Sequence, residues 1–366
     1  MLVYVHVPFC ARRCSYCDFA IAVRREVPSA AFAEATLDEW ARRQDAAGWT
    51  EAPGVETVYF GGGTPSRLAP EALSAILDGI RSRRAMADGA EITLEANPDD
   101  VTPERASAWV ESGINRVSLG VQSFHGPTLS WMHRTHQADQ VAPAVRTLRT
   151  AGIANLSLDL IYGVPLSLER DWQDDVHRVL ALEPEHVSFY ALTVESGTPL
   201  GKWSQRGDVA PAPDQRVAEE YLWASSALAG AGFVHYEVSN AGRPGYRAVH
   251  NAGYWERRPF LGLGPSAHSG WGEERQWNIR EWEAYRSAVA AHVDPVAGQE
   301  RLSESQVRLE EAYLGLRTDH GVEESRVPGR ERDLWLGSGW AVVAGGRVRL
   351  TPEGWLRLDA LVPRVA

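Results

Sequence analysis

The chain has 366 residues, 44% of them hydrophobic, which is enough for one large domain and a smaller one. Its net charge of -11 argues against a protein that binds nucleic acid or a membrane surface. It has no apolar run of about 18 residues, so we expect no helix that spans a membrane. It has no basic start followed by an apolar stretch, so we expect no signal peptide and a cytoplasmic protein.

Short apolar runs alternate with helical patterns over the first half of the chain. Such runs, rich in Val, Ile, Leu and aromatic residues, are typical of buried parallel strands. The six predicted strands span residues 2–7, 55–60, 91–95, 116–120, 155–160 and 186–192.

Four helices are expected between these strands, each with apolar residues three or four positions apart. They span residues 70–80, 102–113, 141–152 and 167–180. Pro70 and Thr102 mark two of the beginnings, and Gly113 and Gly152 mark two of the ends. Ser167 is the predicted N-cap of the fourth helix.

Six strand–helix units in series predict an α/β fold with a parallel sheet and right-handed crossovers. Six is fewer than the eight units of a complete barrel, so we expect a partial (β/α)6 TIM-like barrel over residues 1–230. It includes a further helix at 214–229. A strand at 233–238 opens an extension over residues 231–300.

The pattern changes in the last part of the chain. We expect a helix at 304–316, a hairpin over 340–350 that turns at Gly345–Gly346, and a last helix at 352–361. Residues 301–366 therefore predict a smaller C-terminal winged-helix-like domain.

The only three cysteines lie within eight residues, as Cys10-x3-Cys14-x2-Cys17 directly after the first strand. An odd, clustered set in a reducing compartment argues for a metal site rather than disulfides. Each thiolate can hold one iron of a [4Fe–4S] cluster, so three leave one iron open. An open iron can chelate the amine and carboxylate of S-adenosylmethionine, and this spacing is the signature of the radical-SAM superfamily.

Two other interpretations of the cysteines remain. They can be buried structural thiols, or they can bind zinc with His6 as the fourth ligand. His6 precedes the cysteine loop on a predicted strand, where a side chain more often packs or orients a neighbour.

Polar or glycine residues follow several predicted strands, at the end of a parallel barrel where active sites collect. They are Gly61–Pro65, Glu95, Gln122 with Ser123, Asp159 and Ala191. The glycine run lets backbone approach a ligand closely and can contact the ammonium group of the methionine moiety. Taken singly, glycines also occur in ordinary loops, and Asp159 can be a helix cap or a paired buried charge.

Several segments together resemble the oxygen-independent coproporphyrinogen III dehydrogenase family. They are residues 4–10 (YVHVPFC), Cys14 to Cys17, 61–65 (GGGTP), 95–98 (EANP), 120–123 (GVQS), 158–163 (LDLIYG), 236–240 (YEVSN) and 261–265 (LGLGP). The resemblance covers nearly the whole chain.

The resemblance implies a set of residues that bind S-adenosylmethionine: Tyr4, Tyr16, Gly62, Gly63, Thr64, Glu95, Gln122, Arg134, Asp159 and Ala191. Glu95 and Asp159 can accept hydrogen bonds from ribose hydroxyls or an amine. Arg134 can contact a carboxylate, and its other interpretation is a surface arginine.

Two features distinguish branches of this family. The dehydrogenase branch carries one more cysteine two positions after the third, and here that position is Phe19. Residues 250–255 (HNAGYW) resemble the His-Asn-x-x-Tyr-Trp signature of the HemW branch, the haem chaperones, and make 231–300 a family-specific extension.

This motif implies haem as cargo. His250 would be an axial ligand of the haem iron, and Tyr254 and Trp255 would stack on the macrocycle. A packed histidine on an aromatic-rich turn is the alternative. His268 is a second, weaker candidate.

The leading hypothesis is a haem chaperone that holds a [4Fe–4S] cluster and S-adenosylmethionine and passes haem to acceptor haemoproteins, including membrane-associated ones. The rival is a coproporphyrinogen III dehydrogenase, whose cofactor chemistry converts two propionates to vinyl groups. A radical-SAM enzyme with an unrelated substrate is the third. The catalytic residues are unknown, and the sequence leaves monomer and homodimer open.

Overall fold

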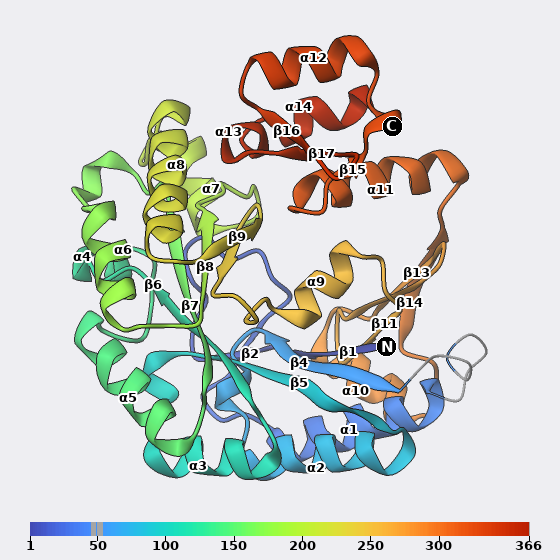
Figure 1. Cartoon of the computed structure of the whole chain (residues 1–366). Helices are drawn as coiled ribbons and strands as arrows, with labels where there is room; N and C mark the ends of the chain where they lie inside the picture. Colours follow the sequence, from blue (N-terminus) through green and yellow to red (C-terminus); the bar gives the residue numbers. More distant parts are fainter. Residues whose placement is uncertain (45–48, 50–53, 366) are drawn as a thin grey trace.

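The computed structural model describes residues 1–44, 49 and 54–365. Residues 45–48, 50–53 and 366, which belong to the predicted first and last domains, lie outside the described residues. Figure 1 shows a curved sheet wrapped by helices, with the C-terminal domain above it.

Six parallel strands form the centre of a 12-stranded sheet, in the order in which they occur along the chain. They are β1 (Leu2–Val7), β4 (Val55–Gly62), β5 (Met86–Ala96), β6 (Arg116–Gln122), β7 (Asn155–Tyr162) and β8 (His186–Ala191). The expected partial (β/α)6 barrel is confirmed, and each predicted strand overlaps an observed one.

The remaining strands of this sheet come from residues 234–301 and lie at both of its edges. At one edge β11 (Phe260–Leu263) pairs in parallel with β1, followed by β12 (His268–Trp271), β13 (Glu274–Asn278) and β14 (Val296–Arg301). At the other edge β10 (Asn240–Gly242) pairs antiparallel with β8 and with β9 (Val234–Glu237). The segment therefore continues the barrel sheet on both sides.

Helices cover the outer face of the sheet (Figure 1). They are α1 (Ser29–Arg43), α2 (Pro70–Arg83), α3 (Pro103–Ser112), α5 (Val141–Ala151), α6 (Trp172–Ala181) and α8 (Asp214–Gly230). Thr102 accepts a hydrogen bond from the Arg105 amide as the N-cap of α3. Gly113 and Gly152 end α3 and α5 with φ of 98° and 107°, which glycine adopts without a steric penalty.

The predicted start of the fourth helix is wrong. Ser167 lies in a separate 3-10 turn, Leu166–Leu168, after which Glu169 takes a positive φ. Helix α6 begins at Trp172, and the Asp171 carboxylate accepts hydrogen bonds from two amides of its first turn. An aspartate at the actual break satisfies these amides directly, which Ser167 is too far upstream to do.

The smaller elements complete the barrel. They are β2 (Phe9–Cys10), β3 (Ala22–Val23), α4 (Gly126–Trp131), α7 (Pro199–Gln205), α9 (Val249–Trp255), α10 (Trp282–Ala290) and the 3-10 turns Pro65–Arg67, Pro98–Asp100 and Ala138–Gln140. Helix α9 lies between the barrel strands and the C-terminal domain (Figure 1). No helix among the described residues has both the length and the apolar character required to cross a bilayer.

The C-terminal domain contains α11 (Glu304–Arg317), α12 (Gly329–Gly337) and a three-stranded sheet of β15 (Val322–Glu323), β17 (Arg347–Leu350) and β16 (Ala341–Ala344). The hairpin turns at Gly345 and Gly346 as expected. The single last helix predicted at 352–361 is wrong. It is broken at Arg357, whose φ of -117° and ψ of 9° are not helical, into α13 (Pro352–Trp355) and α14 (Leu358–Leu361), and both pieces contribute side chains to the core.

The barrel strands have one apolar face and one polar face. Their outward residues, such as Val3 and Val5, pack under the helices. Their inward residues alternate with these and are mostly polar: Tyr4, His6, Thr57, Tyr59, Glu91, Glu95, Arg116, Ser118, Ser157, Asp159, His186 and Ser188. The interior is thus a polar column that runs from the N-terminal to the C-terminal ends of the strands.

Candidate functional site

The three cysteines lie at the C-terminal end of β1, on a loop that is closed at its base. Strand β2, which ends at Cys10, pairs with β3, so residues 11–21 leave and return at the same place. Cys10 is buried, and Cys14 and Cys17 are half-buried. All three thiols therefore come from one short constrained loop.

Backbone contacts hold this loop against two other parts of the barrel. The Ser15 amide donates to the Met132 carbonyl at 3.1 Å, and the Ser15 carbonyl accepts from the Leu200 amide at 2.8 Å. Arg12 donates to the His133 carbonyl at 2.7 Å. These long-range contacts between protein groups hold the loop in place.

The environment of the thiols suits sulfur atoms that bind a metal cluster. Burial raises the pKa of Cys10, and it raises that of Cys17 to about 11, so a thiolate there requires a positive partner such as iron. Thr64 Oγ1 lies 3.5 Å from Cys10 Sγ, and Arg134 Nη1 lies 3.7 Å from Cys14 Sγ. Hydrogen bonds to sulfur of this kind tune iron–sulfur clusters. The donor set fits a [4Fe–4S] cluster, in which each thiolate binds a different iron.

His6 holds the end of the cysteine loop. Its Nε2 lies 2.9 Å from the Ala20 carbonyl, and its Nδ1 lies 3.1 Å from the Tyr4 hydroxyl. Both ring nitrogens are therefore engaged away from the sulfurs. Among the described residues, no three His, Cys, Asp or Glu side chains are arranged to bind one metal ion.

The glycine run after β4 is required by close packing. A Cβ on Gly62 would lie 2.6 Å from the His6 ring, and one on Gly63 would lie 2.8 Å from the Pro8 carbonyl. Gly62 also has a φ of 111°, which side chains rarely tolerate. The glycines bring the end of β4 against the start of the cysteine loop.

Glu95 lies at the end of β5, where it accepts hydrogen bonds from the Tyr59 hydroxyl at 2.8 Å and the Gly62 amide at 3.1 Å. Burial, with a smaller effect of the nearby Asp159 charge, raises the pKa of Glu95 to about 7. A carboxyl group in this state gains from a cationic ligand, which favours its ionised form.

Asp159 lies two strands away and accepts hydrogen bonds from two serines. The Ser118 hydroxyl is 2.9 Å from Oδ2, and the Ser157 hydroxyl is 3.1 Å from Oδ1. Burial raises its pKa despite these donors. Asp159 is therefore neither a helix cap nor a partner in a close ion pair, and it joins Glu95 as a second carboxyl group inside the barrel.

Arg134 is not a surface arginine. It is half-buried and donates to the Asn97 side chain and, at 3.1 Å, to the Gly120 carbonyl, besides facing Cys14. It joins the ends of β5 and β6 to the cysteine loop. Gln122, at the end of β6, has a φ of 65°, a strained conformation for a residue with a side chain.

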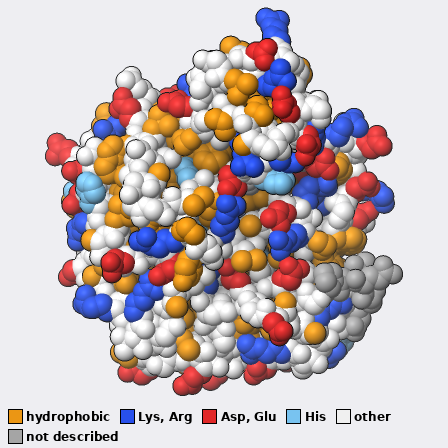
Figure 2. Space-filling view, viewed as in Figure 1, with side chains coloured by type: hydrophobic (Ala, Val, Ile, Leu, Met, Phe, Trp, Pro, Cys, Tyr) orange, Lys and Arg blue, Asp and Glu red, His pale blue; other side chains and the backbone are white. Residues whose placement is uncertain are grey.

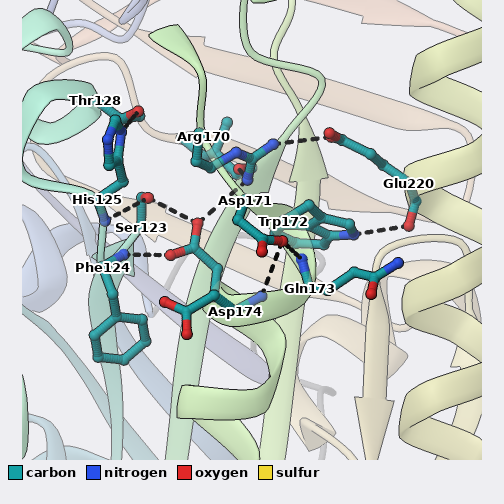
Figure 3. A network of polar contacts seen from close by, with 12 residues as sticks. Ser123, Phe124, His125, Thr128, Arg170, Asp171, Trp172, Gln173, Asp174 and Glu220 are labelled. Atoms are coloured by element: carbon teal, nitrogen blue, oxygen red, sulfur yellow. Dashed lines mark hydrogen bonds and ion pairs between the residues drawn. The ribbon is translucent and has the colours of Figure 1, made fainter.

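A buried ion network joins the residues that follow β6 to those that follow β7 (Figure 3). Asp175 accepts from the Ser123 hydroxyl at 2.7 Å and from the Phe124 amide at 2.6 Å. Arg170 contacts both Asp175 at 3.3 Å and Glu220 at 2.8 Å. Glu220 in turn accepts from the Gly163 amide after β7 at 2.8 Å. Truncating one member of such a network leaves a buried charge unpaired.

The other two predicted cofactor residues are also at this end of the barrel. Ala191 is the last residue of β8 and is half-buried. Tyr16 packs from the cysteine loop against Met132, Ile161 and Val164. The structure thus collects the cysteines and the predicted cofactor residues, apart from Tyr4, around the C-terminal strand ends, and Tyr4 lies deeper, on the inward face of β1.

His250 lies at the opposite, N-terminal end of the polar column. It is 1% exposed, with Nδ1 2.6 Å from Thr57 Oγ1 and Nε2 2.9 Å from the Tyr254 hydroxyl. Its ring stacks on Tyr59 at 5.0 Å. Burial lowers its pKa to about 3, so the ring is neutral at pH 7, the form that binds metals.

The other motif residues are distributed around His250. The Glu91 carboxylate accepts from the amides of Val249 and His250 and fixes the start of α9. Trp255 packs under the Arg317 guanidinium at 4.3 Å. His268 is exposed on β12, away from the motif helix, with its ring 6.0 Å from Trp277.

Sequence reasoning missed Tyr59, Asn97 and Ser118, which hold Glu95, Arg134 and Asp159 in place. A signal was present. Thr57, Tyr59 and Gly61 alternate with Val58 and Phe60 along one strand, as expected of a strand with one polar face.

Comparison with known proteins gives concordant similarities. A profile of the radical SAM superfamily matches residues 4–179. The heme chaperone HemW of Mycobacterium tuberculosis is 38% identical over 98% of this chain and 93% of that protein. The heme chaperone HemW of Synechocystis is 37% identical over 89% of this chain and 80% of that protein.

One solved structure shares the fold along the whole chain. It is the coproporphyrinogen III oxidase HemN of Escherichia coli, described as a radical SAM enzyme, with 20% identity and a TM-score of 0.82. The alignment covers 100% of this chain and 89% of that one. At this identity the similarity concerns the fold.

Proposed function

The chain belongs to the HemW-type haem chaperone family of radical SAM proteins, and from this premise we propose that it binds haem and delivers it to haemoproteins. The observation that carries the proposal is similarity to a heme chaperone along 98% of the chain, including the motif at 250–255. Phe19, which is 58% exposed at the position of the extra cysteine of the dehydrogenase branch, supports the same reading.

The superfamily implies a [4Fe–4S] cluster and S-adenosylmethionine. In our proposal Cys10, Cys14 and Cys17 hold the cluster, which when bound supplies an open iron for chelation and one-electron chemistry. The protein binds and orients the ligand. Glu95 and Asp159 accept hydrogen bonds from its polar groups, and Arg134 keeps the cysteine loop on the strand ends.

Haem contacts the motif helix α9 in this proposal. His250 carries a neutral imidazole, but both of its nitrogens are engaged, so ligation to iron requires the exchange of one hydrogen bond. The Tyr254 hydroxyl is the partner to exchange, because the contact with Thr57 lies deeper inside the barrel. Tyr254 then becomes free to face the macrocycle, with Trp255 beside it.

The acceptors in this proposal are haemoproteins, including membrane-associated ones, and the protein acts in the cytoplasm as a monomer or homodimer. Sedimentation with and without haem and S-adenosylmethionine will determine the oligomeric state.

Haem titration of cluster-reconstituted protein tests the proposal. Wild type should give a saturable Soret change, His250→Ala should bind at least about tenfold more weakly, and His320→Ala, which removes an exposed histidine outside the motif, should bind like wild type. Transfer of haem to an apo-haemoprotein, separated from the donor afterwards, then tests delivery.

A parallel assay tests the rival function. Protein with cluster and S-adenosylmethionine is incubated anaerobically with coproporphyrinogen III and a reductant. Decarboxylated product in the absence of haem binding would overturn the chaperone proposal. Haem binding and transfer without turnover supports it.

A further inference from the structure

A cleft lies between the motif helix α9, strands β11 to β13 and helix α11 of the C-terminal domain. It has a volume of about 170 Å³. Its wall contains aromatic rings from the barrel and charged groups from both sides: Tyr254, Phe260, Trp271, Arg257, Arg275 and Glu310. We call this set the α9–α11 cleft.

The aromatic part of the cleft is continuous with His250. Tyr254 and Phe260 pack edge to face at 4.8 Å, and the Tyr254 hydroxyl is 2.9 Å from His250 Nε2. A flat ligand on these rings would lie one side chain away from the imidazole.

The charged part of the cleft is the Glu310 carboxylate, shared by two guanidinium groups, and one of these, Arg257, also pairs with Glu311 at 3.3 Å. Glu310 lies 2.6 Å from Arg257 Nε and 2.8 Å from Arg275 Nη2. The exposed fractions of these side chains are 20% for Arg257, 18% for Arg275 and 28% for Glu310. Basic and acidic side chains are interleaved where the C-terminal domain meets the barrel (Figure 2). A partly buried carboxylate between two arginines is the arrangement with which proteins bind carboxylate ligands.

We propose that the α9–α11 cleft binds the propionate carboxylates of a tetrapyrrole through Arg257 and Arg275, and that Glu310 occupies their place until the ligand arrives. The inference rests on the proposed function and adds to it a carboxylate site distinct from the iron ligand. The macrocycle packs against Tyr254, Phe260 and Trp271, while its two carboxylates replace the single carboxylate of Glu310.

The cleft is smaller than its proposed ligand, so the proposal requires it to open. Small-molecule sites have volumes of about 300 Å³ or more, so this cleft must widen to admit a tetrapyrrole. Release of Glu310 removes two of the ion pairs between α11 and the barrel, while Glu311 keeps its contact with Arg257 at 3.3 Å and Arg317 keeps its ion pair with Glu237 at 2.9 Å. Ligand binding and opening of the domain interface are therefore one event.

The experiment compares haem with haem dimethyl ester, in which the carboxylates are blocked. Both are titrated into wild type, Glu310→Gln, Arg257→Gln and Arg275→Gln. Haem should bind Glu310→Gln about tenfold more tightly than wild type, because the competing carboxylate is gone, and each arginine variant about tenfold more weakly. The ester should bind weakly and alike to all four.

Asp319→Asn is the matched control. Asp319 pairs with Arg247 across the same domain interface and is 31% exposed, close to the value for Glu310, but it does not line the cleft. It should leave haem affinity unchanged. Near-ultraviolet circular dichroism establishes that each variant is folded, and Arg257→Lys or Arg275→Lys replaces the glutamine variant at the same position if that variant is not.

The two proposals fail in different ways. If haem and its ester bind equally to wild type, or if Glu310→Gln binds haem no better than Asp319→Asn does, the carboxylate site is wrong and haem binding stands. If neither ligand binds to any variant, the proposed function itself is overturned, and the inference with it.

Discussion

The two ends of the polar barrel interior are built differently. At the N-terminal end, both ring nitrogens of His250 are hydrogen-bonded. The ring nitrogens of His186 contact the hydroxyls of Ser157 and Tyr236 at 2.8 Å each. The Glu91 carboxylate accepts hydrogen bonds from two backbone amides. At the C-terminal end, Glu95 and Asp159 are carboxyl groups whose pKa values are raised by burial although the charge of Arg116 opposes the shift, and neither forms an ion pair within the part of the chain that the structure describes. We call these the paired end and the acceptor end.

The difference shows how each end can take a ligand. The acceptor end already presents two carboxyl groups without an ion-pair partner among the described residues, besides the three thiols, so a cationic or metallic ligand binds there without breaking an ion pair. The paired end is satisfied, so a ligand there must replace an existing partner. In our proposals the haem iron replaces the Tyr254 hydroxyl at His250, and the propionates replace the Glu310 carboxylate in the α9–α11 cleft.

The largest expected effect is the loss of the cluster from the acceptor end. Cys14→Ser should abolish the cluster, because three protein thiolates are the minimum of this motif, while the unfolding free energy of the cluster-free protein changes by no more than about 0.5 kcal/mol. Iron and sulfide analysis after anaerobic reconstitution checks the first outcome, and denaturant unfolding checks the second. Phe19→Ser, at the exposed position next to the motif, should retain full iron content.

The next largest effect is a loss of stability when a contact at the paired end is removed. Glu91→Leu removes the acceptor of the Val249 and His250 amides, and it removes the ion-pair partner 3.9 Å from the buried Arg116. We expect a loss of about 3 kcal/mol or more in unfolding free energy, measured by urea unfolding of the cluster-free protein. Asp78→Asn removes an exposed ion pair with Arg81 and should cost less than about 0.5 kcal/mol. Equal effects of the two changes would remove the distinction between the ends.

A pH titration sharpens the comparison. With a pKa of about 7, Glu95 is protonated below neutrality and ionised above it. A cationic ligand binds the carboxylate more tightly than the neutral acid. The affinity for S-adenosylmethionine should therefore rise with pH up to about 7 and then level off, and the total rise should be about tenfold for each unit by which the bound ligand lowers the pKa of Glu95. Equilibrium dialysis between pH 5.5 and 8.5 checks this. Glu95→Gln should flatten the profile and the exposed Glu71→Gln should not, and a profile unchanged in Glu95→Gln would assign the titration to another group.

The smallest expected effect concerns the sulfur ligands. Thr64→Val keeps the shape of the side chain but removes the hydroxyl 3.5 Å from Cys10 Sγ. The iron content should be unchanged. A hydrogen bond to sulfur stabilises the reduced cluster, which carries one more negative charge, so its loss should lower the midpoint potential of the cluster. Spectroelectrochemistry measures it, and a shift to higher potential would contradict the assigned contact.

The sequence alone determined the features that have a local physical cause. Apolar runs located the six barrel strands, and Thr102, Gly113 and Gly152 marked helix ends, because capping and φ preferences act over a few residues. The cysteine spacing and the glycine run indicated the cofactor end for the same reason.

The tertiary structure alone decided what depends on partners far apart in the chain. No local pattern pairs β11 with β1, puts Glu91 under α9 or sets Glu310 between Arg257 and Arg275, because each contact joins segments 35 to 258 residues apart and exists only after the sheet closes. The position of α6 also involves a distant partner, because the indole of its first residue, Trp172, donates to the Glu220 carbonyl 48 residues away. Local preferences determine where helices and strands form. Burial and long-range pairing determine which of their polar side chains remain available to a ligand.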